Sequence, residues 1–169
     1  MPVSDCISIK QMFRNCELAG CFNSKSPFVF TILSPFLSVL FAETKMASGH
    51  CLCGQFKFEA EGDPRWVAYC HCASCRRHTA SPVSCFVNLN LTQLRFSGER
   101  SIYASSPGVR RSFCATCGTP LAYETAERPG EIDLYINVFD HPEAFIPQKH
   151  VFYAEHIAWF DVQDDLPRE

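Results

Sequence analysis

The chain has 169 residues, 11 cysteines and a formal net charge of −3 at pH 7. This length suits one domain with a substantial hydrophobic core. The mildly acidic balance, without runs that interleave basic and aromatic residues, argues against nucleic acid or an anionic membrane as a partner. The cysteines are too closely spaced, and odd in number, for a complete disulfide framework. They therefore indicate metal binding in a reducing compartment, which we expect to be the cytoplasm.

The first part of the chain, residues 1–45, differs in character from the rest. Its most apolar stretch, residues 27–42, reads PFVFTILSPFLSVLFA. Proline and serine interrupt it, and it is shorter than the roughly 20 apolar residues of a membrane span. Basic residues upstream make it similar to the apolar segment of a signal peptide, although secretion fits poorly with metal-type thiols. We favour a third interpretation, in which Met46 is the working start, residues 1–45 are an extension and residues 46–169 form the functional domain.

Beyond residue 49 the chain is a series of short strand-like segments separated by glycine and proline. QFKFEA at 55–60 alternates polar and apolar residues, as a half-buried strand does. Only residues 72–79 have the character of a short helical turn. We therefore expect an all-β, single-domain fold, with strands at 55–60, 65–70, 82–89, 94–98, 101–105, 109–114, 120–124, 131–139 and 150–160.

Four cysteines form two matched pairs, each followed by a glycine that lets the backbone curl around a ligand. The pairs lie in CLCG at 51–54 and CATCG at 114–118, and they supply Cys51, Cys53, Cys114 and Cys117. Four thiolates complete a tetrahedron and leave zinc no open position, so this pattern predicts a structural site. Such binding contributes roughly 10–16 kcal/mol of folding free energy in small zinc modules.

Three further cysteines, Cys70, Cys72 and Cys75, form a triplet in the stretch YCHCASCRRH. Three protein thiolates and one exchangeable position are typical of a catalytic zinc, so we expect two zinc ions per chain. The vacant corner can take water, hydroxide or a substrate thiolate, whose pKa the metal lowers. His71 is an alternative fourth ligand, although an extended backbone would turn it away from the metal. The seven thiols could also be shared differently between the two sites.

Two pairs of arginines lie close to the cysteine clusters and are candidates for holding the carboxylates of an anionic thiol substrate. They are Arg76, Arg77, Arg110 and Arg111. In the alternative interpretation these arginines pair with Glu99, Glu124 or Glu127. Proton transfer at the site needs a base, for which His71 and His78 are the nearest candidates in the sequence.

The cysteine motifs together resemble one protein family. G-H-C-L-C-G at 49–54, C-H-C-A-S-C-R-R at 70–77, F-C-A-T-C-G-T at 113–119 and W-F at 159–160 are similar to the glutathione-dependent formaldehyde-activating (GFA) family, which includes the centromere-protein-V-like domains. The resemblance runs from about Gly49 to Leu166. In one departure, this chain has Ala80 close to where the family usually has glycine after the triplet.

The resemblance implies a zinc-organised β-tent of small antiparallel sheets. It also implies a structural zinc on Cys51, Cys53, Cys114 and Cys117, and a more labile zinc on Cys70, Cys72 and Cys75. The activity that it implies is formation of S-hydroxymethylglutathione from glutathione and formaldehyde, which is a carbon–sulfur lyase reaction in the reverse sense.

The mechanism that we expect from these residues ionises a substrate thiol at the open zinc, and the thiolate then adds to a small carbonyl carbon. Two other interpretations remain open at the level of sequence. One is a zinc-stabilised binding module without turnover. The other is a metal-free redox protein that uses Cys70, Cys72 and Cys75 in thiol exchange.

Overall fold

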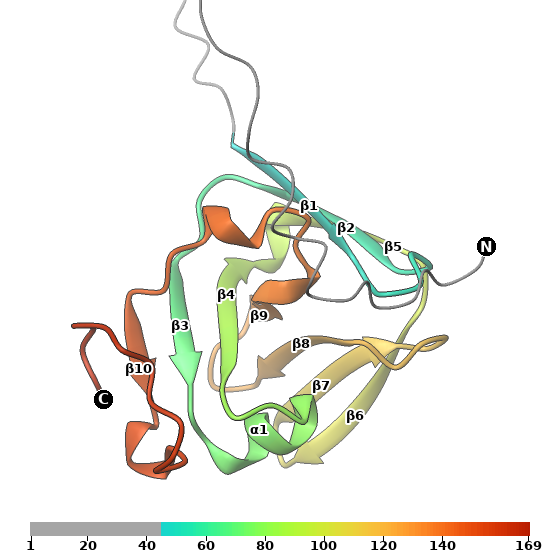
Figure 1. The fold of residues 1–169 in the computed structure, drawn as a ribbon. Helices are drawn as coiled ribbons and strands as arrows, with labels where there is room; N and C mark the ends of the chain where they lie inside the picture. The colour runs from blue at the N-terminus through green and yellow to red at the C-terminus, as the bar shows by residue number, and fades with distance from the viewer. Residues whose placement is uncertain (1–44) are drawn as a thin grey trace, which may run out of the picture. The chain divides into compact units, whose positions relative to one another are not determined.

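The computed structural model of this protein describes residues 45–169 (Figure 1). The predicted extension and its apolar stretch at 27–42 therefore lie outside the described residues, apart from Lys45. The described part is mostly β, which confirms the predicted fold class. Within it, no helix has both the length and the apolar character needed to cross a membrane.

The described residues form ten strands, one α-helix and four 3₁₀ turns. The strands are β1 (Met46–His50), β2 (Lys57–Glu61), β3 (Trp66–Cys70), β4 (Ser84–Asn90), β5 (Leu94–Ser97), β6 (Arg100–Ser106), β7 (Val109–Cys114), β8 (Pro120–Thr125), β9 (Glu131–Tyr135) and β10 (Lys149–Val151). The helix is α1 (Ala73–Thr79), and the 3₁₀ turns are η2 (Leu91–Gln93), η3 (Ile136–Val138), η4 (Pro142–Ala144) and η5 (Tyr153–Glu155).

The strands make two sheets, which Figure 1 shows with the smaller one above the larger. The small sheet has the order β1-β2-β5 and is antiparallel throughout. The large sheet has the order β10-β3-β4-β9-β8-β7-β6, and its strand pairs are antiparallel except for β10 and β3. That parallel pair requires a long crossover, which η3 and η4 supply between β9 and β10.

The main hydrophobic core joins the two sheets. In β2, Phe58 and Ala60 are buried while Lys57 and Glu59 are exposed, so the alternation of the sequence directs one face of the small sheet inward. The ring of Phe58 meets Phe139, which follows η3, edge to face at 4.9 Å between centroids. The large sheet contributes Val67, Val87, Leu89, Leu121, Ala122, Ile132 and Leu134 to the same core.

A second, smaller cluster lies at the other end of the large sheet, beside α1. Cys70, Cys75, Phe86 and Tyr135 are its buried members. Cys72 is the N-cap of helix α1, and its sulfur accepts a hydrogen bond from the Cys75 amide at 3.3 Å. Because a cysteine caps the helix, the first turn of the helix lies against the sulfurs. The local fold of this segment therefore sets the arrangement of the thiols.

Candidate functional site

The structure divides the seven clustered thiols into a group of four and a group of three. The group of four joins the end of β1 to the end of β7, and its Sγ atoms all lie within 4.8 Å of one another. Cys51 and Cys53 are 3.5 Å apart at sulfur, and Cys53 and Cys114 are 3.8 Å apart. A tetrahedral zinc with bonds of 2.3 Å separates its sulfurs by about 3.8 Å. These donors, with Cys117 as the fourth, fit a zinc ion.

Two tight turns hold the four thiols. Gly54 and Gly118 each adopt a positive φ, at +73° and +75°, which is the conformation that glycine adopts without steric cost. The amide of Gly54 donates to the carbonyl of Cys51 at 2.9 Å, and the amide of Gly118 donates to the carbonyl of Cys114 at 3.0 Å. The Phe56 amide donates to the Cys51 sulfur at 3.3 Å. Such amide donors stabilise thiolates, which are the form that binds a metal.

Thr119 connects the two turns and acts on the fourth thiol. Its hydroxyl oxygen accepts from the Leu52 amide at 3.1 Å and lies 3.1 Å from the Cys117 sulfur. The hydroxyl hydrogen bond, followed by backbone donors, lowers the pKa of the Cys117 thiol to about 5. No role was expected for this threonine, although it ends the F-C-A-T-C-G-T motif at 113–119.

The group of three is formed by Cys70, Cys72 and Cys75, whose Sγ atoms also lie within 4.8 Å of one another. Cys70 ends β3, Cys72 precedes α1 and Cys75 lies in its first turn. Hydrogen bonds from the thiols of Cys70 and Cys75, together with the Cys75 amide, lower the pKa of the Cys72 thiol to about 2. The same shared bonds raise the pKa of Cys70. This set of soft sulfur donors also fits zinc.

His71 lies between two of these cysteines but takes part in a different contact. Its Nε2 is 2.8 Å from Nδ1 of His150, and Nε2 of His150 is 3.1 Å from both carboxylate oxygens of Asp164. Burial lowers the pKa of His71, which keeps its ring neutral. With Asp164 ionised, His150 donates to it and accepts from His71. Within residues 45–169, the sulfurs of the triplet are grouped with no histidine.

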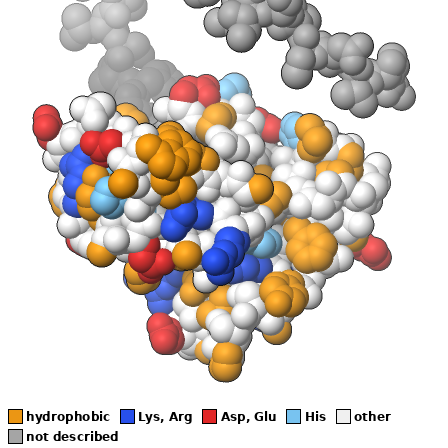
Figure 2. Space-filling model, turned by 60° about the horizontal axis from the view of Figure 1, so that its bottom comes forward, with side chains coloured by type: hydrophobic (Ala, Val, Ile, Leu, Met, Phe, Trp, Pro, Cys, Tyr) orange, Lys and Arg blue, Asp and Glu red, His pale blue; other side chains and the backbone are white. Residues whose placement is uncertain are grey.

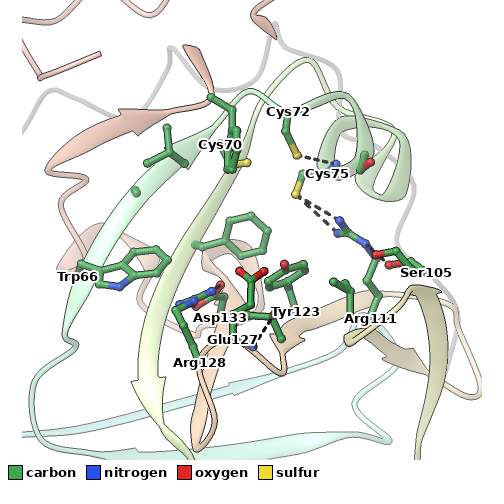
Figure 3. Close-up of a pocket in the computed structure, with 18 of the residues that line it drawn as sticks. Trp66, Cys70, Cys72, Cys75, Ser105, Arg111, Tyr123, Glu127, Arg128 and Asp133 are labelled. Carbon is green, nitrogen blue, oxygen red and sulfur yellow. Dashed lines mark hydrogen bonds and ion pairs between the residues drawn. The ribbon is translucent and has the colours of Figure 1, made fainter. Parts of the chain in front are cut away.

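A cavity of about 560 Å³ opens beside the group of three (Figure 3). Cys70, Cys72 and Cys75 lie at one end of it, and Arg128 and Asp133 lie at the other. Figure 2 shows this side of the molecule, where Lys and Arg side chains gather near the middle of the face among hydrophobic ones. A cavity of this size suits a small organic ligand or a short peptide.

Arg111 alone among the four predicted arginines lines this cavity. It lies on β7 and only 5% of its surface is exposed. Its Nη1 and Nη2 atoms are each 3.6 Å from the Cys75 sulfur. The remaining contacts are with the hydroxyls of Tyr135 and Ser105, each at 3.3 Å.

The other three predicted arginines lie outside the cavity lining. Arg110 forms an ion pair with Glu124 at 2.7 Å, as in the alternative interpretation of the sequence. Arg76 donates to backbone carbonyls at 2.8 and 3.0 Å, and Arg77 is exposed. The two histidines considered as bases, His71 and His78, do not line the cavity either.

The lining of the cavity away from the thiols contains charged residues that were not expected to bind the substrate. Arg128 stacks on Trp66, with 5.4 Å between guanidinium carbon and ring centroid, and donates to Asp133 at 3.0 Å. Lys149 and Glu127 also line the cavity. These residues are far in sequence from any cysteine, so no local pattern links them to the thiols.

One comparison with known protein families gives a match. The sequence profile described as "glutathione-dependent formaldehyde-activating enzyme" matches residues 46–155. The chain belongs to this family. Both thiol groups of this GFA-family chain lie inside the matched range, whereas Asp164 lies beyond it.

Two other comparisons complete the description of this GFA-family chain. A crystal structure of a Rhodobacter sphaeroides protein, a structural genomics target, is similar at 22% sequence identity and a TM-score of 0.47. The similarity covers 55% of this chain and 87% of that one. A comparison with curated proteins returned no match.

Proposed function

We propose that this member of the GFA family is a zinc-dependent carbon–sulfur lyase-type enzyme. Its reaction is formation or cleavage of S-hydroxymethylglutathione, or of a closely related adduct between a small thiol and a small aldehyde. The observation that supports this most directly is that the group of three thiols lines a cavity of about 560 Å³. A three-thiolate metal site beside such a cavity has room for an exchangeable fourth ligand.

The proposal assigns one zinc ion to each thiol group and the activity to residues 46–169. Cys51, Cys53, Cys114 and Cys117 hold a structural ion, since four thiolates leave no open position. Cys70, Cys72 and Cys75 hold the catalytic ion. When bound there, zinc would hold a substrate thiol as its thiolate and so supply a nucleophile at neutral pH.

The protein's own residues bind and orient the substrate in this proposal. Trp66 and Phe86 contribute apolar surface to the cavity, which excludes water from the reacting sulfur. Arg128 and Lys149 line the cavity and would exchange their present acidic partners, Asp133 and Glu169, for the carboxylates of a glutathione-like substrate. This assignment replaces Arg76, Arg77 and Arg110, whose side chains lie outside the cavity lining.

The chemical step forms one bond and needs no oxidant. The substrate sulfur donates an electron pair to the carbonyl carbon, and the π electrons of the C=O bond move to its oxygen. The proton that the thiol released on ionising returns to that oxygen through solvent at the open side of the cavity, so an O–H bond forms beside the C–S bond and the product is a hemithioacetal. The reverse sequence releases the aldehyde and the thiol.

Metal analysis of matched cysteine variants tests this proposal. We expect two zinc ions in the wild-type protein and in the control Cys85→Ser, since Cys85 belongs to neither thiol group. Cys72→Ser should fold, retain one zinc ion and lose formation of the glutathione–formaldehyde adduct. Cys117→Ser should fail to fold, because the structural ion contributes folding free energy. Collapse of both variants alike would contradict the division into two roles.

The same preparations separate the enzyme from a binding module. An enzyme of this kind should change the environment of one zinc ion when glutathione is added, and it should speed up adduct formation above the uncatalysed rate. A protein whose two zinc ions ignore glutathione, and which produces no turnover, is a zinc-stabilised module instead.

A further inference from the structure

Arg111 is a buried cation without a carboxylate partner among residues 45–169. Arg100 and Arg128 are half-buried, and each has an acidic partner within 3.2 Å. The neighbouring Arg110 is exposed and pairs with Glu124. A buried charge without a counterion is strongly destabilising, so the structure must supply an anion for Arg111 by other means.

The contacts of the guanidinium point to the Cys75 sulfur, which is an anion when it ligates a metal. Two of its nitrogens approach that sulfur at 3.6 Å, in a forked arrangement (Figure 3). The hydroxyls of Tyr135 and Ser105 accept two further N–H groups, and the ring of Tyr123 lies 5.0 Å from the guanidinium carbon. Four of the five N–H donors of an arginine are thereby engaged. The side chain is fixed in place and its charge is directed at one sulfur of the triplet.

The charge of Arg111 matters because the triplet by itself accumulates negative charge. A divalent zinc ion with three thiolates carries one net negative charge, and a substrate thiolate as fourth ligand would raise it to two. The permanent positive charge of Arg111 removes one of these charges. Donation to the Cys75 sulfur also draws electron density from that ligand, which makes the metal a better acceptor for a further thiolate.

We propose that Arg111 is a positioning residue that acts through Cys75 to make the three-cysteine site accept an anionic sulfur as its fourth ligand. This role rests on the proposed function, because it requires an open metal position. It differs from the role expected from the sequence, in which Arg111 holds a substrate carboxylate. The two roles predict different responses to the charge and chemistry of a probe ligand.

Ligand titration of the cobalt(II)-loaded full chain tests the role of Arg111. The two probes are 2-mercaptoethanol, which binds as a thiolate and has no carboxylate, and imidazole, which binds as a neutral ligand. The visible absorption of cobalt reports binding of either probe. Arg111→Met should weaken 2-mercaptoethanol binding by at least about tenfold and change imidazole binding by less than about twofold. Arg110→Met, the control on the same strand, should behave as the wild type does.

If Arg111→Met loses the cobalt absorption of the four-cysteine site, the variant has not folded. The variant Arg111→Lys, which keeps the positive charge, then decides the result. Retention of 2-mercaptoethanol affinity within about threefold supports the proposal, since the charge is preserved. Loss of that affinity with unchanged imidazole binding overturns it.

The remaining outcomes separate this role from the proposed function. If the wild-type protein binds neither probe, the three-cysteine site has no open position, and the proposed function fails together with the role of Arg111. If the wild-type protein binds both, but Arg111→Met binds 2-mercaptoethanol equally well or loses both probes equally, only the role of Arg111 is overturned.

Discussion

The buried pair His71 and His150 gives the most quantitative test of how the three-cysteine segment is held. His71 is 1% exposed and His150 is 0% exposed, and the 2.8 Å bond between their rings connects the triplet to β10. The His71 amide donates to the carbonyl of Val151 at 3.1 Å, and its ring meets Tyr153 edge to face. Replacing His150 with phenylalanine keeps an aromatic ring of similar shape and removes only the nitrogen contacts.

The expected loss of stability in His150→Phe depends on which buried polar atoms lose their hydrogen-bond partners. Loss of one hydrogen bond costs about 1 kcal/mol, and a buried donor without an acceptor costs about 1–3 kcal/mol. His71 already has one buried nitrogen, Nδ1, without a partner in the described residues. We therefore expect His150→Phe to lower the free energy of unfolding by about 2–3 kcal/mol. For a domain of this size that corresponds to a fall in Tm of about 6–12 °C.

A double-mutant cycle isolates the interaction energy between His71 and His150. His71→Phe alone should cost about 1–2 kcal/mol, and the double variant should cost at least about 1 kcal/mol less than the sum, because neither ring then leaves the other unpaired. Urea denaturation of the zinc-loaded protein, followed by tryptophan fluorescence and by zinc content, measures each value. The exposed His141→Phe serves as the control, with a change of less than about 0.5 kcal/mol. Additive losses in the double variant would refute the reasoning.

Three further predictions concern single positions. Ala80 follows α1 with φ +50°, so Ala80→Gly should raise the free energy of unfolding by about 0.5–1 kcal/mol in urea titration; no gain would mean that the turn relaxes without cost. A Cβ on Gly49 would lie 2.1 Å from the carbonyl oxygen of Val138 in η3, so Gly49→Ala should cost at least about 2 kcal/mol by the same assay; a smaller cost would mean that η3 moves away from β1. Burial raises the pKa of Cys85 to about 12, so about one thiol in ten thousand is ionised at pH 8. Iodoacetamide labelling of the zinc-loaded protein followed by mass spectrometry should leave Cys85 unmodified until urea unfolds the protein, and rapid labelling without urea would show that it is open to solvent.

Local patterns predict most of the strands because burial alternates within a strand. In β2 the sequence KFEAE and the observed alternation of exposed and buried residues coincide. The last predicted strand is the main difference, since residues 150–160 form only β10 at Lys149–Val151 and then the turn η5. Phe152 adopts φ +53°, which ends the strand, and Tyr153 packs against His71 instead. Aromatic residues are enriched in strands, so composition alone does not distinguish a strand from a turn whose rings cover a buried histidine.

The sequence by itself predicted two groups of thiols, one of four and one of three, because ligand spacing and the glycines after each pair are local properties of the chain. The distances between the sulfurs then selected this sharing over the others. Only the tertiary structure decided which arginine meets the thiols. Arg110 and Arg111 are neighbours of the same type, and the alternation of a strand sends one outward and one inward without indicating which. Arg111 and the next residue, Ser112, are both buried, so β7 is covered on both faces at this point. Which of the two faces the cavity depends on the packing around the strand, and no local pattern contains that information.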